Sequence, residues 1–169
     1  ILNAGKHVFS EKPFVLSVDE GRALLDLAEE KGLRVGSAPD TFLGGAHQQA
    51  RALIDSGELG QITGGMAAVM GRGMEMWHPN PDFFFAKGGG PVLDIGPYYI
   101  TNLVQLIGPI TRVACFSSTP RTERQITSEP RAGEFVQVET PTSLRAILEF
   151  QNGATVTLNT SWDVHSHGM

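Results

Sequence analysis

The sequence has a single cysteine, Cys115, among its 169 residues, so it can form no internal disulfide bond. A chain without disulfides is typical of a reducing compartment, and we expect a cytoplasmic protein. Residues 113–116 have the composition of a buried strand, where we expect the thiol to act as a small apolar group.

Long apolar runs and basic clusters are also missing. No stretch approaches the roughly 20 apolar residues of a membrane-spanning helix. The formal net charge is -5, and binding to a phosphate backbone needs a basic surface. We therefore expect neither nucleic acid nor a membrane as a partner. Residues 1–6 lack the charged start and cleavage signature of a secretory signal.

The chain contains no G-x-G-x-x-G motif, the strand–turn–helix that cradles the pyrophosphate of a dinucleotide. Neither Gly71-Arg72-Gly73 nor Gly88-Gly89-Gly90 opens a suitable helix after a strand. The chain starts at Ile1 and has no closing element after residue 162, so we expect an internal part of a longer polypeptide.

The first 38 residues have a strand–helix–strand pattern. Residues 6–9 and 33–37 predict strands, and the helix between them begins with a capping box, in which Ser17 and Glu20 satisfy each other's backbone N–H groups. This order is typical of a parallel α/β sheet. We interpret residues 1–38 as the last βαβ unit of a Rossmann-type domain.

Residues 39–169 predict a second α/β domain, whose end is incomplete. We expect helices over 46–57 and 92–107, a long loop over 71–90, another loop over 119–134, and strands over 66–70, 111–118, 135–139, 143–151 and 154–162. The last two strands form a hairpin across Asn152-Gly153. Pro97 has no N–H to donate, so the second helix should kink or begin later there.

The hairpin alternates apolar and polar residues. One face carries Leu144, Ala146, Leu148, Phe150, Ala154, Val156 and Leu158. The other carries Arg145, Glu149, Thr155, Thr157 and Asn159. This pattern predicts an open, mainly antiparallel sheet with one side packed on helices and one side free for water or a partner subunit.

Glu11-Lys12-Pro13 follows the first predicted strand. Open α/β sheets bind ligands at the carboxyl ends of their strands, so this lysine is a candidate site residue, although a surface turn would have the same sequence.

Asp94 and Tyr98 are four residues apart behind the run of three glycines, a spacing that puts two side chains on one helix face. A carboxylate and a phenol one turn apart can orient a substrate hydroxyl and pass its proton. A helix-terminal Asp and a core Tyr would explain the pair equally well.

Three further residues are candidate sugar-binding groups: His47, Trp77 and His78. Ordinary polar residues of helices and loops are the alternative. We expect His165 and His167 to lie in a solvated tail. The spacing of the histidines and Asp94 matches no metal site, and we expect no metal.

Five segments in their order resemble the Gfo/Idh/MocA family, named for glucose–fructose oxidoreductase, inositol dehydrogenase and a rhizopine-catabolism protein. They are residues 4–13, 53–60, 88–96, 148–153 and 161–162. The resemblance implies a Rossmann domain for NAD or NADP, followed by an α/β domain whose open sheet often joins the subunits of a homodimer or homotetramer.

The resemblance also implies roles for individual residues. Lys12, with Glu11 and Pro13, would lie beside the nicotinamide and contact substrate, and Asp94 would hold substrate. Many members have a histidine as general acid/base where this chain has Tyr98, whereas glucose–fructose oxidoreductases have a tyrosine, which puts the substrate in doubt. Many relatives also have Asn-Arg where this chain has Asp40-Thr41.

We therefore expect an enzyme: an NAD(P)-dependent oxidoreductase that moves a hydride between nicotinamide and the CH–OH carbon of a sugar, polyol or related compound, with Lys12, Asp94 and Tyr98 as catalytic residues. The 169 residues alone should be inactive without the pyrophosphate motif. Two alternatives remain, an NAD-dependent glycosidase of the same fold and a non-catalytic regulator that senses a sugar or nucleotide.

Overall fold

The computed structural model describes residues 1–165 and divides into two compact units, Ile1–Asp40 and Thr41–Met169. The architecture is mixed α/β, as the sequence predicted. Within the described residues, no helix combines the length and apolar character that crossing a membrane requires. His167 lies outside the part of the chain that the structure describes.

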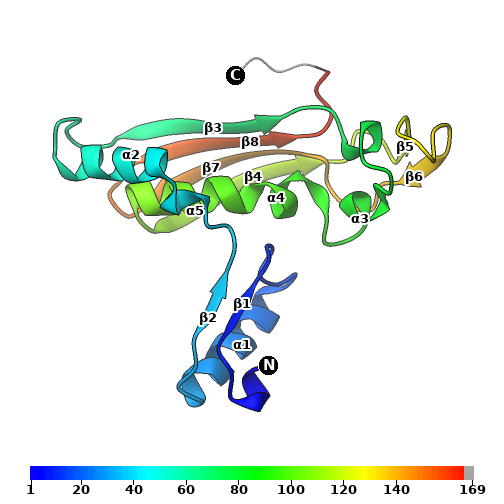
Figure 1. Ribbon diagram of the computed structural model, residues 1–169. Helices are drawn as coiled ribbons and strands as arrows, with labels where there is room; N and C mark the ends of the chain where they lie inside the picture. Colours follow the sequence, from blue (N-terminus) through cyan, green and yellow to red (C-terminus); the bar gives the residue numbers. More distant parts are fainter. Residues whose placement is uncertain (166–169) are drawn as a thin grey trace. The chain divides into compact units, whose positions relative to one another are not determined.

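The first unit contains the predicted strand–helix–strand. A short 3-10 helix, η1 (Leu2–Ala4), precedes strand β1 (Val8–Ser10), helix α1 (Val18–Glu30) and strand β2 (Val35–Ser37) (Figure 1). The two strands pair in parallel. Helix α1 begins where expected, because the Ser17 side chain accepts a hydrogen bond from the Glu20 N–H at 3.2 Å.

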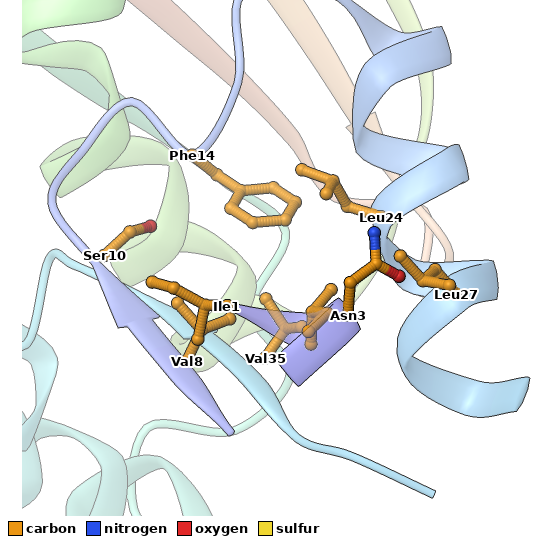
Figure 2. Close-up of a pocket in the computed structure, with 9 residues that line it drawn as sticks. Ile1, Asn3, Val8, Ser10, Phe14, Leu24, Leu27 and Val35 are labelled. Atoms are coloured by element: carbon orange, nitrogen blue, oxygen red, sulfur yellow. The ribbon is translucent and has the colours of Figure 1, made fainter. Parts of the chain in front are cut away.

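This unit has an apolar hollow of about 310 Å³, which is lined mainly by residues of η1, β1, α1 and β2 (Figure 2). Its walls are Ile1, Leu2, Asn3, Val8, Ser10, Phe14, Leu24, Leu27 and Val35. None of these nine side chains is titratable, so the hollow offers no acid–base chemistry.

The second unit is built on a four-stranded sheet in the order β3-β8-β7-β4. Strand β3 runs parallel to β8, and the other neighbours are antiparallel, as predicted for a mainly antiparallel sheet. The strands are β3 (Gly64–Met70), β4 (Ile110–Ser118), β7 (Ser143–Phe150) and β8 (Thr155–Ser161). A small antiparallel ribbon, β5 (Glu123–Gln125) and β6 (Phe135–Gln137), lies at one end of the sheet (Figure 1).

Helices cover one face of this sheet (Figure 1). They are η2 (Thr41–Leu43), α2 (Gly45–Asp55), α4 (Gly90–Asp94) and α5 (Gly96–Ile107), while η3 (Met74–Met76) and α3 (Asp82–Phe85) belong to the long connection after β3. The apolar hairpin face predicted from the sequence forms the core, and Tyr99, Ile100, Leu103 and Ile107 of α5 pack against it.

Three expectations need correction. The helix expected over 92–107 with a kink or later start at Pro97 is two separate helices, because Pro97 cannot donate to a carbonyl and the chain breaks at Ile95. The expected loop 119–134 contains β5, whose three residues are too few to show alternation. Cys115 lies in a strand as predicted, yet it is exposed, because β4 is the edge strand and its residues from Thr111 onward are exposed.

Candidate functional site

The three residues of the Glu11-Lys12-Pro13 motif lie directly after the carboxyl end of β1. The neighbouring strand end is tied to them, because the Ala38 N–H donates to the Ser10 carbonyl at 2.9 Å. The Glu11 carboxylate accepts a hydrogen bond from the Lys12 N–H at 3.1 Å, and the Lys12–Pro13 peptide is cis. The motif thus occupies the edge of a parallel pair of strands where α/β sheets bind ligands.

Asp94 and Tyr98 lie on either side of the break between two helices. Asp94 ends α4, Tyr98 is in the first turn of α5, and both side chains are half-buried. The break stays tight, since the Tyr98 N–H donates to the Ile95 carbonyl at 3.1 Å. The sequence predicted one helix face for the two residues, but the structure has them on two different helices, because the chain breaks at Ile95.

The glycine run ahead of Asp94 is required by close backbone contacts. A Cβ on Gly89 would lie 2.3 Å from the Phe84 carbonyl oxygen, and one on Gly90 would lie 2.9 Å from the Pro141 carbonyl oxygen. Gly90 also has φ of +87°, which L side chains rarely adopt. These contacts fix the start of α4, and with it Asp94, against α3 and the segment before β7.

Trp77 and His78 belong to a segment that we call the aromatic loop, residues 74–85. The His78 ring makes edge contacts with the rings of Trp77, Phe83 and Phe84, with centroids 5.2–5.3 Å apart. Its Nδ1 accepts a hydrogen bond from the Asn80 N–H at 3.1 Å, so Nε2 carries the proton of the neutral imidazole. Trp77 is 64% exposed. This arrangement gives an exposed aromatic face beside an N–H donor.

A buried ion cluster below the aromatic loop was not predicted. Arg124 of β5 contacts Glu75 of η3 at 2.7 Å and Asp163, just after β8, at 2.8 Å. The same guanidinium donates to the Trp162 carbonyl at 2.8 Å and lies over the Phe85 ring. These charges are far apart in the sequence and follow no periodic pattern, so no sequence signal could pair them.

A second arginine, Arg131, holds the aromatic loop from the outside. It donates to the Asp82 carboxylate and to Asn80 Oδ1, the latter at 2.9 Å. Its hydrogen bond lowers the pKa of the Asp82 carboxyl below the usual value, although burial opposes the shift. Glu134 also contacts Arg131, at 2.8 Å. Both arginines come from the segment around β5 and β6, which therefore supports the loop.

Two other candidate histidines belong to other elements, although His165 lines a small hollow together with Met76 of this loop. His47 is half-buried in the first turn of α2, and His165 is exposed at the end of the described chain. Within residues 1–165, no three His, Cys, Asp or Glu side chains are grouped as metal ligands. The structure thus brings Trp77 and His78 together, has Asp94 and Tyr98 on the two sides of a helix break, and has Lys12 in the first unit.

Two family models match the chain. The model described as the GFO/IDH/MocA C-terminal domain matches residues 47–168. The model described as the oxidoreductase family, NAD-binding Rossmann fold, matches residues 1–38. Together they account for both units.

Individual relatives agree. An uncharacterized oxidoreductase of Schizosaccharomyces pombe is 35% identical over 63% of this chain and 29% of its own length. D-glucoside 3-dehydrogenase of Escherichia coli is 28% identical over 95% of this chain and 46% of its own length. Among solved structures, levoglucosan dehydrogenase in complex with NADH and L-sorbose matches 98% of this chain and 43% of that chain, with a TM-score of 0.83 and 24% identity.

The chain spans less than half the length of these relatives. The C-terminal domain model alone covers more than half of the chain. Its matched residues include the long loop and the Asp94–Tyr98 region. The chain belongs to the Gfo/Idh/MocA family of oxidoreductases.

Proposed function

We propose that the chain is part of an NAD(P)-dependent oxidoreductase that acts on the CH–OH group of a sugar, polyol or related compound by hydride transfer. The observation that carries this proposal is Lys12 at the carboxyl edge of the parallel strands β1 and β2, in a chain of this family. Relatives named as D-glucoside 3-dehydrogenase and levoglucosan dehydrogenase support a sugar-like substrate.

We propose that residues 1–38 supply the final βαβ unit of a Rossmann domain and that residues 39–169 bind the substrate. The parallel strands and the match of residues 1–38 to an NAD-binding model support the first assignment. The glycines, aromatic loop and half-buried polar residues of the second unit support the other.

The residues of this chain fit one end of a nicotinamide cofactor, NAD or NADP. Glu11, Lys12 and Pro13 lie at the strand ends where such sheets bind ligands. The pyrophosphate motif is not among the 169 residues, so tight binding needs further strands. When bound, the cofactor supplies the nicotinamide carbon that accepts or gives the hydride.

The chain's own residues would then act on the substrate hydroxyl. Tyr98 exchanges the hydroxyl proton, Lys12 stabilises the developing alkoxide with its ammonium group, and Asp94 orients the substrate. Trp77 stacks on the sugar ring, and His78 and His47 donate or accept hydrogen bonds with other hydroxyls. The exposed ring of Trp77 and its contact with His78 support this division of roles.

The test needs a polypeptide that joins these residues to the preceding strands of a dinucleotide-binding domain, which we call the extended polypeptide. A panel of sugars, glycosides and polyols is offered with NAD⁺ or NADP⁺, and the formation of the reduced cofactor is followed by absorbance. Net reduction by at least one sugar is expected. Glycoside hydrolysis with only catalytic NAD⁺, or sugar binding without turnover across the panel, would contradict the proposal.

We also propose that the chain forms a homodimer or homotetramer through the open face of its sheet. Along this face Met66, Thr157, Ile147 and Ala114 are cross-strand neighbours. Phe116, in the next row, is 87% exposed. Met66, Ile147 and Phe116 thus place exposed apolar side chains among polar ones on this face, and exposed apolar patches mark protein interfaces.

Sedimentation of two variants tests the assembly. Phe116→Arg adds a charge to the open face, whereas Val113→Arg, on the same strand, adds one to the helix-covered side, where Val113 pairs with Leu148. Dissociation by the first variant alone is expected. A wild-type monomer, or equal effects of both variants, would contradict this interface.

We also propose that the protein is located in the cytoplasm. The single cysteine has no partner for an internal disulfide, and its exposed position on the edge strand suits a reducing compartment. Alkylation of Cys115 in intact cells followed by mass spectrometry tests this, and a thiol found oxidised would contradict it.

A further inference from the structure

Glu75 is held at both its side chain and its backbone, although it belongs to a connecting segment. Its carboxylate contacts Arg124 at 2.7 Å, with only 6% and 3% of the two side chains exposed. Its carbonyl accepts a hydrogen bond from the Thr127 N–H at 2.9 Å. Connecting segments are usually mobile, so this degree of burial and bonding is unusual for one.

The backbone of the next residues is held in the same way, although their side chains are less buried than that of Glu75. The His78 carbonyl accepts a hydrogen bond from Ser128 Oγ at 2.6 Å. The Trp77 N–H and the His78 N–H both donate to the Met74 carbonyl, at 3.2 and 2.9 Å. The backbone is therefore fixed by polar contacts underneath, while Trp77 remains exposed.

Arg124 connects this segment to the end of the sheet. Its guanidinium contacts Glu75, Asp163 and the Trp162 carbonyl through three different nitrogens. Asp163 is held in turn by the Thr142 hydroxyl at 2.6 Å. The planar, forked guanidinium makes these contacts together, which the compact ammonium of a lysine cannot do.

We infer that Arg124 is a positioning residue, which sets the place and orientation of Trp77 and His78 for binding a sugar ring by tying Glu75 to the end of β8. The inference rests on the proposed function in one respect, the role of Trp77 and His78 toward substrate. Holding an aromatic side chain in place before binding lowers the cost of ordering it with the ligand.

The mobility of Trp77 tests the inference without any catalysis. The chain has two tryptophans, and Trp162 is only 3% exposed, so the emission that acrylamide quenches comes from Trp77. Its anisotropy decay is compared between the wild-type chain, Arg124→Lys and the control Arg112→Lys. Arg112 also pairs with a carboxylate, that of Glu149, but it belongs to β4 and not to the segment that supports the loop.

We expect Arg124→Lys to increase the amplitude of fast Trp77 motion about twofold and Arg112→Lys to leave it nearly unchanged. A folded Arg124→Lys chain with wild-type Trp77 motion would overturn the inference. If circular dichroism shows that the Arg124→Lys chain is unfolded, the same measurement is made on the Glu75→Gln variant instead. That variant keeps an oxygen for the Arg124 N–H but loses the charge, so increased Trp77 motion is again expected, and unchanged motion again overturns the inference.

Measuring KM and kcat of the extended polypeptide tests whether the position of Trp77 affects sugar binding. Arg124→Lys should raise KM for the sugar about tenfold and change kcat much less, because the reacting groups stay in place. Adding Trp77→Ala should give no further increase, since both changes remove the same contact. If Trp77→Ala alone leaves KM unchanged, the substrate role of Trp77 is wrong, while the anisotropy result still decides whether Arg124 positions the loop.

Discussion

The Nε atom of Arg124 donates to Oε1 of Glu75 across 2.7 Å, and both side chains are almost fully buried. Burying two charges costs free energy that their attraction repays only with good geometry and further hydrogen bonds. Arg124 gains such bonds from Asp163 and the Trp162 carbonyl, whereas Oε2 of Glu75 is buried with no hydrogen-bond partner among the described residues. The cluster is therefore sensitive to the loss of any one member.

Replacement of Arg124 by Met should destabilise the chain strongly. Glu75 and Asp163 would remain as buried carboxylates without their cation, and breaking a buried ion pair in this way costs about 3–5 kcal/mol. Urea denaturation followed by circular dichroism measures the loss. The control Arg112→Met removes an exposed ion pair with Glu149 and should change the midpoint little. Equal midpoints for the two variants would contradict the assigned importance of the cluster.

Gly73 should tolerate no side chain. A Cβ there would lie 2.0 Å from Glu75 Oε2 and 2.8 Å from Arg124 Nη2, so Gly73→Ala must push the ion cluster apart. We expect a loss of about 3 kcal/mol in the free energy of unfolding. Gly71→Ala, two residues away, meets no atom within 4 Å and should stay within about 0.5 kcal/mol of wild type. A harmless Gly73→Ala would mean that the cluster is arranged differently.

The contact between Arg131 and Asp82 predicts a dependence of stability on pH. Hydrogen bonding to Arg131 lowers the pKa of Asp82 in the folded chain. Ionised Asp82 therefore adds stability above the unfolded pKa of about 4, and this contribution disappears as the pH falls through the lower, folded value. The midpoint difference between wild type and Asp82→Asn should be largest near neutral pH and shrink in acid. A difference that is constant over this range would contradict the pairing.

The sheet and its covered face could be predicted because alternation is a local property. Leu144, Leu148 and Phe150 alternate with residues of the open face, and all three belong to the core or pack against it. Pro97 likewise predicted an irregularity where α4 and α5 meet, because the effect of its missing N–H is confined to one helical turn.

Features that depend on distant parts of the chain could not be predicted. Arg124 finds Glu75 and Asp163 only after the long connection folds back, and none of the three stands in a recognisable motif. The exposure of Cys115 depends on β4 being the outermost strand, which the sequence of β4 does not encode. By contrast, Lys12 and Asp94 could be proposed as site residues from the sequence because their motifs are local.

The account depends most on Lys12, whose ammonium is proposed to stabilise the developing alkoxide of the substrate. The decisive measurement is kcat/KM of the extended polypeptide, compared between Lys12→Ala and the control Lys6→Ala, an exposed lysine that precedes β1. Loss of a group that stabilises charge in the transition state should lower the value about 100- to 1,000-fold for Lys12→Ala. Lys6→Ala should leave it unchanged. A Lys12→Ala enzyme that turns over its sugar at the wild-type rate would contradict the proposed mechanism.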